Sequence, residues 1–315
     1  MRNTAHERFL GAVLGYHVDR AKAESRVDQL INSFAITPVN LDPSGIVGKL
    51  EHILNTYDDH LKAELRTLAG GATETDVNNL TNLLEISIGL DTMFRIVRHY
   101  YLLAQKQGGM LALALLQMSL PTIMDEAEAY HAAIDAFAEG KPVGDGVGVS
   151  VVSKLAMGIE GKELVRDTMV YDTVWEDRRL LIVRAKGPGG NVGKPGLAVE
   201  KLIQDDGPIT LVVTVDAALK LEGEKSGEVV EGVGAAIGGP GTERYHIEEA
   251  AVKREIPLLA VVVKMSSKEA ISSITTEISG AVEEATRRVQ RAILAQTKPG
   301  DTTIVAGIGN TIGIA

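Results

Sequence analysis

One segment, from Arg178 to Ile203, constrains the fold more than any other, because it predicts a strand, a glycine-rich loop and a helix start in immediate succession. Leu180 to Ala185 are almost all strand-forming residues in a run too short for a helix, which is typical of a buried strand. Pro195 suits the first turn of a helix, where no backbone N–H is needed. Such a unit predicts an α/β sheet.

The glycine-rich loop between the strand and the helix predicts a site for a small anion. Glycines remove the Cβ atoms that would keep a ligand from the backbone, and free amides at the positive end of a helix favour phosphate or carboxylate. We therefore expect a nucleotide or a phosphorylated small molecule to bind here. The candidate contacts in the loop are Gly187, Gly189, Gly190, Asn191, Gly193 and Lys194.

The loop departs from the two best-known phosphate-binding patterns. The phosphate loop of nucleoside triphosphatases needs glycine five residues before its Gly-Lys pair and Ser or Thr after it, but Pro188 and Pro195 occupy those positions. The glycines instead form GxGxxxG, which is one residue longer than the dinucleotide fingerprint. The fit to a dinucleotide site is therefore near but incomplete.

Asp216 suggests two further hypotheses. It follows the next predicted strand, at about the distance where an acidic residue would bind a ribose hydroxyl, so an NAD(P)-dependent oxidoreductase is an alternative function, although no catalytic constellation accompanies it. Asp216 also begins a long acidic loop with Glu222 and Glu224. These three carboxylates are suitable ligands for Mg²⁺, and a solvated acidic face is the other interpretation of the loop.

From residue 180 onward the pattern alternates between strands and helices. Strands are expected at 180–185, 209–215, 258–264 and 302–306, and helices at 195–204, 245–254 and 268–296. This order predicts a mostly parallel, Rossmann-like sheet whose ligands lie at the carboxyl ends of the strands. The last of these ends adds Gly307, Gly309 and Asn310 to the candidate site. Residues 168–174 are expected to pair with 179–185 as a hairpin.

The first part of the chain predicts helices, so we expect an all-helical domain over 1–140 and an α/β domain over 141–315. Apolar spacing of three and four residues predicts one amphipathic helix from Thr4 to Phe34, and a second helix capped by Ser44 and ending at a turn near Asp58. The longest helix is expected from about Thr75 to Gln107. Two shorter helices are expected at 110–120 and 121–137.

Composition and charge narrow the partners. The net charge of -10 argues against nucleic acid or an anionic membrane surface as the main partner, and no segment is long and apolar enough to span a bilayer. The absence of cysteine fits a cytoplasmic protein. The long helix 75–107 offers more apolar surface than a thin domain can cover, which predicts a homodimer. A nonenzymatic assembly or regulatory protein is therefore a third functional hypothesis.

Several long strings resemble a family of archaeal proteins catalogued only as a domain of unknown function. In the second half these strings are KGPGGNVGKPG, VDAALKLEGEKSGEVVEGVGAAIGG, YHIEEAAVKREIPLLAVVVK and VAGIGNTIGI. In the first half they are LDPSGIVGKLEHIL, VRHYYLLA and GDGVG, so the resemblance covers most of the chain. It implies an intracellular archaeal protein. It implies no activity, cofactor or catalytic residue.

Overall fold

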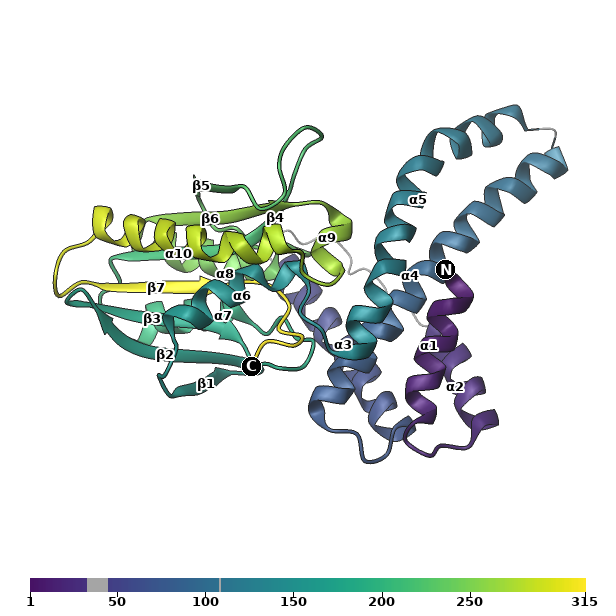
Figure 1. Ribbon diagram of the computed structural model, residues 1–315, viewed down its shortest axis with the longest axis horizontal. Coiled ribbons are helices and arrows are strands. Elements are labelled where there is room, and N and C mark those ends of the chain that lie inside the picture. The colour runs from purple at the N-terminus through teal and green to yellow at the C-terminus, as the bar shows by residue number, and fades with distance from the viewer. Residues whose placement is uncertain (33–44, 108) are drawn as a thin grey trace.

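The computed structural model describes residues 1–32, 45–107 and 109–315, which form a helical domain followed by an α/β domain (Figure 1). Among the described residues, no helix combines the length and the apolar character needed to cross a bilayer. The helical domain contains α1 (Arg2–Leu14), α2 (Arg20–Ile31), α3 (Ile46–Leu68), α4 (Glu74–Gln107) and α5 (Met110–Glu139). Gly140, in the left-handed conformation at φ 64°, ends α5.

The helical domain is built on a core that joins all five helices. Its largest fully buried side chains are Phe9 of α1, Leu61 and Leu65 of α3, Leu84 of α4 and Ile134 of α5. Val27 contributes from α2. Burial of side chains this large stabilises a domain by about 2 kcal/mol each, so the amphipathic spacing of the sequence is the main cause of this packing.

Three helix predictions for this domain are wrong. The helix expected over Thr4 to Phe34 is two helices, because His17 has a left-handed φ of 60° in the turn between them. The turn expected near Asp58 is absent, since α3 continues to Leu68. The two helices expected at 110–120 and 121–137 form one, α5, which contains Pro121. The predicted cap Ser44 lies outside the described residues.

The α/β domain contains one mixed sheet of seven strands. Their order is β1-β2-β3-β7-β4-β6-β5, with β1 (Gly161–Val165), β2 (Thr168–Trp175), β3 (Arg178–Ala185), β4 (Leu211–Leu219), β5 (Val229–Val233), β6 (Leu258–Met265) and β7 (Thr302–Gly307). The four central strands are parallel, and β1, β2 and β5 add antiparallel edges. The expected mostly parallel sheet is therefore a partly parallel one, because the sequence pattern did not predict β1 and β5.

Helices cover both faces of the sheet (Figure 1). On one face α7 (Pro195–Asp205) and α8 (Thr242–Lys253) pack on one another and on the central strands. On the other face lie α6 (Val147–Leu155), which follows the 3-10 turn η1 (Gly144–Gly146), and α10 (Thr276–Gln296). The helix expected over 268–296 is interrupted, and its first turns form the separate α9 (Ser267–Ile271).

The parallel strands and the β2–β3 hairpin follow the sequence pattern closely. The hairpin expected from 168–174 and 179–185 is confirmed, with Thr168 opposite Ala185 and Trp175 opposite Arg178. Asp177 supplies a left-handed residue, φ 58°, in its tight turn. Because β1 pairs with the other side of β2, the hairpin does not form the edge of the sheet.

The chain leaves β4 and β6 toward opposite faces of the sheet. After β4 it passes through β5 to α8 on one face, and after β6 it passes through α9 to α10 on the other. Neighbouring parallel strands whose connections diverge leave a crevice at their carboxyl ends. The helical domain packs at this end, through α5 against α9 and through α3 against α8. The topology therefore positions a site between the two domains.

Candidate functional site

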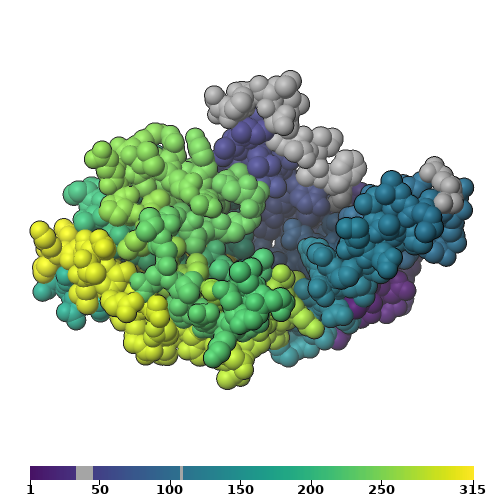
Figure 2. All heavy atoms as spheres, turned by 90° about the horizontal axis from the view of Figure 1, so that it is seen from above, coloured from purple at the N-terminus to yellow at the C-terminus, as the bar shows by residue number. Residues whose placement is uncertain are grey.

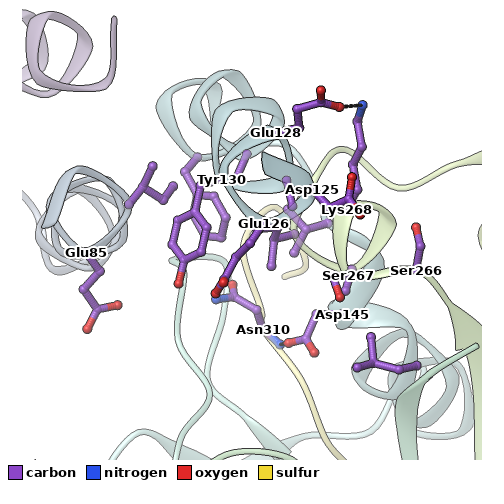
Figure 3. Close-up of a pocket in the computed structure, with 18 of the residues that line it drawn as sticks. Glu85, Asp125, Glu126, Glu128, Tyr130, Asp145, Ser266, Ser267, Lys268 and Asn310 are labelled. Atoms are coloured by element: carbon purple, nitrogen blue, oxygen red, sulfur yellow. Dashed lines mark hydrogen bonds and ion pairs between the residues drawn. The ribbon is translucent and has the colours of Figure 1, made fainter. Parts of the chain in front are cut away.

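A cavity of about 950 Å³ lies between the domains at the diverging ends of β4 and β6. Leu219 at the end of β4 and Lys220 and Glu222 in the following loop line it, together with Ser266 after β6 and Lys268 of α9. Helices α4 and α5 close the opposite side (Figure 3). Small-molecule sites occupy roughly 300–1,000 Å³ at such switch points, so both the size and the position fit a ligand site.

The lining of this cavity is rich in carboxyl groups. Six carboxyl side chains and two lysines line it; the acids are Glu85, Asp125, Glu126, Glu128, Asp145 and Glu222. Figure 3 shows Tyr130 and Glu126 of α5 on one side of the cavity and Asp145 with Asn310 below them. Glu128 of α5 pairs with Lys268 of α9 across 3.9 Å. The cavity therefore offers chiefly hydrogen-bond acceptors, suited to hydroxyl or amino groups.

Two of these carboxyl groups have raised pKa values. Burial, with a smaller effect from Asp58, raises the pKa of Glu85 to about 7. Burial also raises the pKa of Asp145, although its Oδ2 accepts a 2.8 Å hydrogen bond from the Asn310 amide. Because its pKa is near 7, Glu85 can exchange a proton with a ligand, and carboxyl groups with raised pKa values are enriched at functional sites.

A second cavity, of about 370 Å³, lies against the glycine-rich loop. The loop residues Gly190 to Lys194 line one side of it, and Lys62 of α3 and Arg166 of the β1–β2 turn contribute further cationic groups. Asn82, Glu85 and Asn310 line both cavities. The two cavities therefore lie on either side of these three side chains. The smaller cavity is lined by three cationic groups and by the carboxyl groups of Asp58, Glu85 and Asp167, whereas carboxyl groups outnumber lysines in the larger one.

Several backbone amides of the loop already donate to oxygens of the protein. The Gly190 amide donates to Asn79 Oδ1 at 2.8 Å, and the Gly190 carbonyl accepts from Asn82 Nδ2 at 2.8 Å. The Gly193 amide donates to Asn191 Oδ1 at 2.8 Å, and the Lys194 amide to Thr168 Oγ1 at 2.6 Å. Hydrogen bonds from the backbone of the loop to side chains of α4 and to Thr168 of β2 therefore hold the loop between α4 and the sheet.

The start of α7 also has an internal anion. Glu243 Oε2 accepts hydrogen bonds from the amides of Gly196 at 2.8 Å and Leu197 at 3.3 Å. The other oxygen, Oε1, lies 3.7 Å from Lys194 Nζ. Burial raises the pKa of Glu243, against the opposing effects of Lys194 and of these amides. A carboxylate of the chain thus occupies the position that the sequence pattern assigned to a ligand.

The other glycines of the predicted site pack closely against the protein. A Cβ on Gly187 would lie 1.8 Å from the Ile314 carbonyl oxygen, and one on Gly189 would lie 3.0 Å from the Thr75 Cα of α4. Likewise, a Cβ on Gly307 would meet Val152 of α6, and one on Gly309 would meet the Asp145 carbonyl. These glycines allow close approach of backbone and helices, whereas Gly190, Asn191, Gly193, Lys194 and Asn310 line a cavity.

The acidic candidates are separated from one another. Asp216 is 5% exposed, and its two oxygens accept from the Ala217 and Gly238 amides at 2.7 and 3.2 Å. Glu222 lines the larger cavity, while Glu224 pairs with Lys264. The part of the chain that the structure describes contains no group of three or more His, Asp or Glu side chains able to hold a metal ion. Asp216 is also not among the described residues that line the two cavities.

Sequence reasoning missed the contribution of α4. Asn79 and Asn82 hold the glycine-rich loop, and Glu85, one turn further along, faces both cavities. A signal was present, because asparagine is a poor residue for the interior of a helix and Asn78, Asn79 and Asn82 occur within five positions. Because these three asparagines disfavour a helix, their presence within α4 indicates that their side chains make specific polar contacts.

Fold and cavities together define a two-domain α/β protein with a candidate small-molecule site between its domains. The chain belongs to a family known by two models, a "Protein of unknown function (DUF1512) N-terminal domain" matching residues 1–140 and a "Domain of unknown function (DUF1512) C-terminal" matching residues 143–315. The resemblance seen in the sequence to a family of unknown function is therefore confirmed. No curated protein and no solved structure matches the chain.

Proposed function

We propose that the protein binds a phosphorylated small molecule, such as a nucleotide, in the two adjoining cavities between its domains. One observation carries the proposal: the glycine-rich loop lines a cavity together with three cationic side chains, Lys62, Arg166 and Lys194, at the carboxyl ends of the parallel strands. Both domains supply these cations, so the ligand would bridge the domains.

The phosphate is held by side chains in this proposal. Because Glu243 occupies the first amides of α7, Lys194 and Arg166 are the groups left to meet a phosphate. Arg166 now pairs with Asp59 at 2.6 Å, and Lys194 lies at 3.7 Å from Glu243, which is longer than a hydrogen bond. No hydrogen bond therefore has to break for the side chain of Lys194 to turn to a ligand, and Glu243 keeps its two bonds to the amides of α7.

The rest of the ligand would extend past Asn82, Glu85 and Asn310 into the larger cavity. The carboxyl groups there accept hydrogen bonds, so a sugar or an amino group suits this end of the ligand better than a second phosphate. A ligand with a phosphate at one end and hydroxyl or amino groups at the other matches both cavities. Nucleotides and sugar phosphates have this character.

Isothermal titration calorimetry with inorganic phosphate, AMP, ATP and a sugar phosphate tests the proposal on Lys194→Gln. A hydrogen bond to a charged group contributes about 1.5–3 kcal/mol, so the variant should bind a phosphorylated probe at least tenfold more weakly. The loss should be larger at low salt, where the charge is less screened. Lys186→Gln is the matched control, because Lys186 lies beside the loop but pairs with Glu163 at 2.7 Å.

Two results would contradict the proposal: equal affinity of Lys194→Gln and the parent protein for every phosphorylated probe, or no binding by either. Substitution of Gly190 is a poor test. A Cβ there would lie 2.5 Å from Asn82 Nδ2, so the change would disturb the contact between the domains as well as any ligand. Lys194 lies at the cavity and makes no such contact with α4, which is why it is preferred.

A further inference from the structure

The far end of the α4–α5 hairpin, residues 92–107 and 109–124, projects from the body of the protein and is here called the hairpin tip (Figure 1). In Figure 2 it extends at the right of the molecule, away from the α/β domain. It carries a large share of the exposed apolar side chains: Phe94, Ile96, Tyr100, Tyr101, Leu102, Met110, Leu111, Leu113, Leu115, Met118, Leu120 and Met124. An exposed apolar surface this dense marks an interaction site.

The exposed apolar residues lie on two faces of the α5 half of the tip. Leu111, Leu115 and Met118 follow one face at helical spacing, while Leu113 and Leu120 follow another, and all five are exposed. The segment 110–124 contains no charged residue. Because exposed apolar side chains lie on two faces of this uncharged segment, docking on one protein face would cover only one of them.

Charge in the hairpin tip has one sign. It contains three basic residues, Arg95, Arg98 and Lys106, and no acidic residue, although the whole chain has a net charge of -10. Arg95 pairs with Asp91 at the base of the tip at 2.6 Å. The described residues offer no ion-pair partner to Arg98 or Lys106. All three basic residues belong to α4, so one helix of the tip is basic and the other is uncharged.

The difference in charge between the two helices distinguishes between two partners that could cover the hairpin tip. A second copy of the chain, which the length of α4 predicted from the sequence, would bring another set of positive charges against the first. A bilayer with anionic headgroups offers acyl chains to the apolar helix and negative charge to the basic one. The charge of the whole chain argued against such a surface, but the acidic residues lie outside the tip.

We propose that the hairpin tip docks on the surface of an anionic lipid bilayer. The 110–124 segment of α5 lies among the outer parts of the acyl chains, and Arg98 and Lys106 of α4 contact headgroup phosphates. Tyr100 and Tyr101, both exposed, have the amphipathic rings that favour the interface. The hairpin lies on the membrane without crossing it, and the α/β domain stays in water.

Vesicle sedimentation with the full chain tests this docking. The protein should sediment with vesicles that contain phosphatidylglycerol and much less with pure phosphatidylcholine, since each basic side chain near anionic lipid contributes about fivefold in binding. The triple variant Leu111→Gln, Leu115→Gln, Met118→Gln should bind at least tenfold more weakly. Because these positions are exposed, the variant should fold as the parent does. Thermal unfolding checks this.

The matched control is Leu221→Gln, Val233→Gln, Val252→Gln, which removes three apolar side chains that are 73%, 92% and 75% exposed on the α/β domain. It should bind vesicles as the parent does. Equal binding of parent and tip variant, or no binding of the parent to anionic vesicles, overturns the proposal. Light scattering without lipid gives a third overturning result, a dimer that dissociates in the tip variant, because the tip would then belong to a second copy.

Discussion

Replacing Asp216 with asparagine should make the variant gain stability relative to the parent protein as the pH rises from 6 to 8. Asp216 lies within β4, with its side chain enclosed and its oxygens bonded to the Ala217 and Gly238 amides. Burial, with a smaller effect from the Asp145 carboxyl group, raises the pKa of Asp216 from 3.8 to about 8. The folded protein therefore keeps a proton on Asp216 at a pH where the unfolded chain has lost it.

The sign and the size of the effect follow from that difference. A group whose pKa is raised in the folded state contributes stability at low pH, and this contribution is lost between pH 3.8 and about 8. Each pKa unit corresponds to about 1.4 kcal/mol, so the parent protein should lose up to ~3 kcal/mol of unfolding free energy between pH 6 and pH 8 through this group. Asparagine does not titrate and should not show that loss.

Asparagine does not restore both hydrogen bonds of the carboxyl group, because its Nδ2 cannot accept from an amide. The variant should therefore carry a constant cost of about 1–3 kcal/mol that does not change with pH. The pH-dependent difference between variant and parent isolates the titration of Asp216 from that cost.

Chemical unfolding followed by circular dichroism at pH 6, 7 and 8 measures the difference. Asp205→Asn, at an exposed position at the end of α7, is the control for an aspartate substitution outside the core. A stability difference between Asp216→Asn and the parent that stays constant over this range would show that Asp216 is not protonated in the folded protein. The buried acid would then have to be stabilised as an anion by the two amides.

Three further substitutions test the packing within the α/β domain and its contact with α3. Gly148→Ala should destabilise the protein by roughly 3 kcal/mol, because its Cβ would lie 2.2 Å from the Val215 carbonyl oxygen. Gly280→Ala, in open space on α10, should stabilise it by about 0.5–1 kcal/mol. Equal thermal unfolding midpoints for the two variants would refute this. His246→Gln should lower the thermal midpoint more at pH 6 than at pH 9. Burial lowers the pKa of His246, but its bonds to Glu51 and Glu200 outweigh burial and raise it, so the stability it contributes is present below pH 6.5 and lost above the raised pKa. A loss that does not vary with pH would contradict the charged state of His246.

The local pattern of the sequence predicted the centre of the α/β domain well. β3, the loop and α7 follow in the expected order, and the β2–β3 hairpin lies where strand-forming residues flank a short turn. Both predictions rest on neighbours in the chain. The antiparallel strands β1 and β5 were not predicted as strands, because Gly161 and Gly232 weaken their intrinsic preference and pairing with β2 and β6 decides their state.

The candidate site was harder to predict, because its contacts join distant parts of the chain. The Gly190 amide and the Asn79 oxygen that it contacts are 111 residues apart, and Asp145 and Asn310 are 165 residues apart. Spacing within a segment carries no information on such pairs. The sequence did indicate which end of the sheet to examine, since the larger cavity lies at the carboxyl ends of β4 and β6.

Glu243 shows why the inference from a glycine-rich loop to a ligand needs the structure. The physical argument for an anion at the start of α7 is sound, and an anion is there, supplied by α8 of the same chain. The two oxygens of the Glu243 carboxylate have different surroundings, and this difference bears on ligand binding. Its Oε2 holds the helix amides, while its Oε1 makes no hydrogen bond to any described group. Lys194 can therefore exchange Glu243 for a phosphate in the cavity without exposing the start of α7.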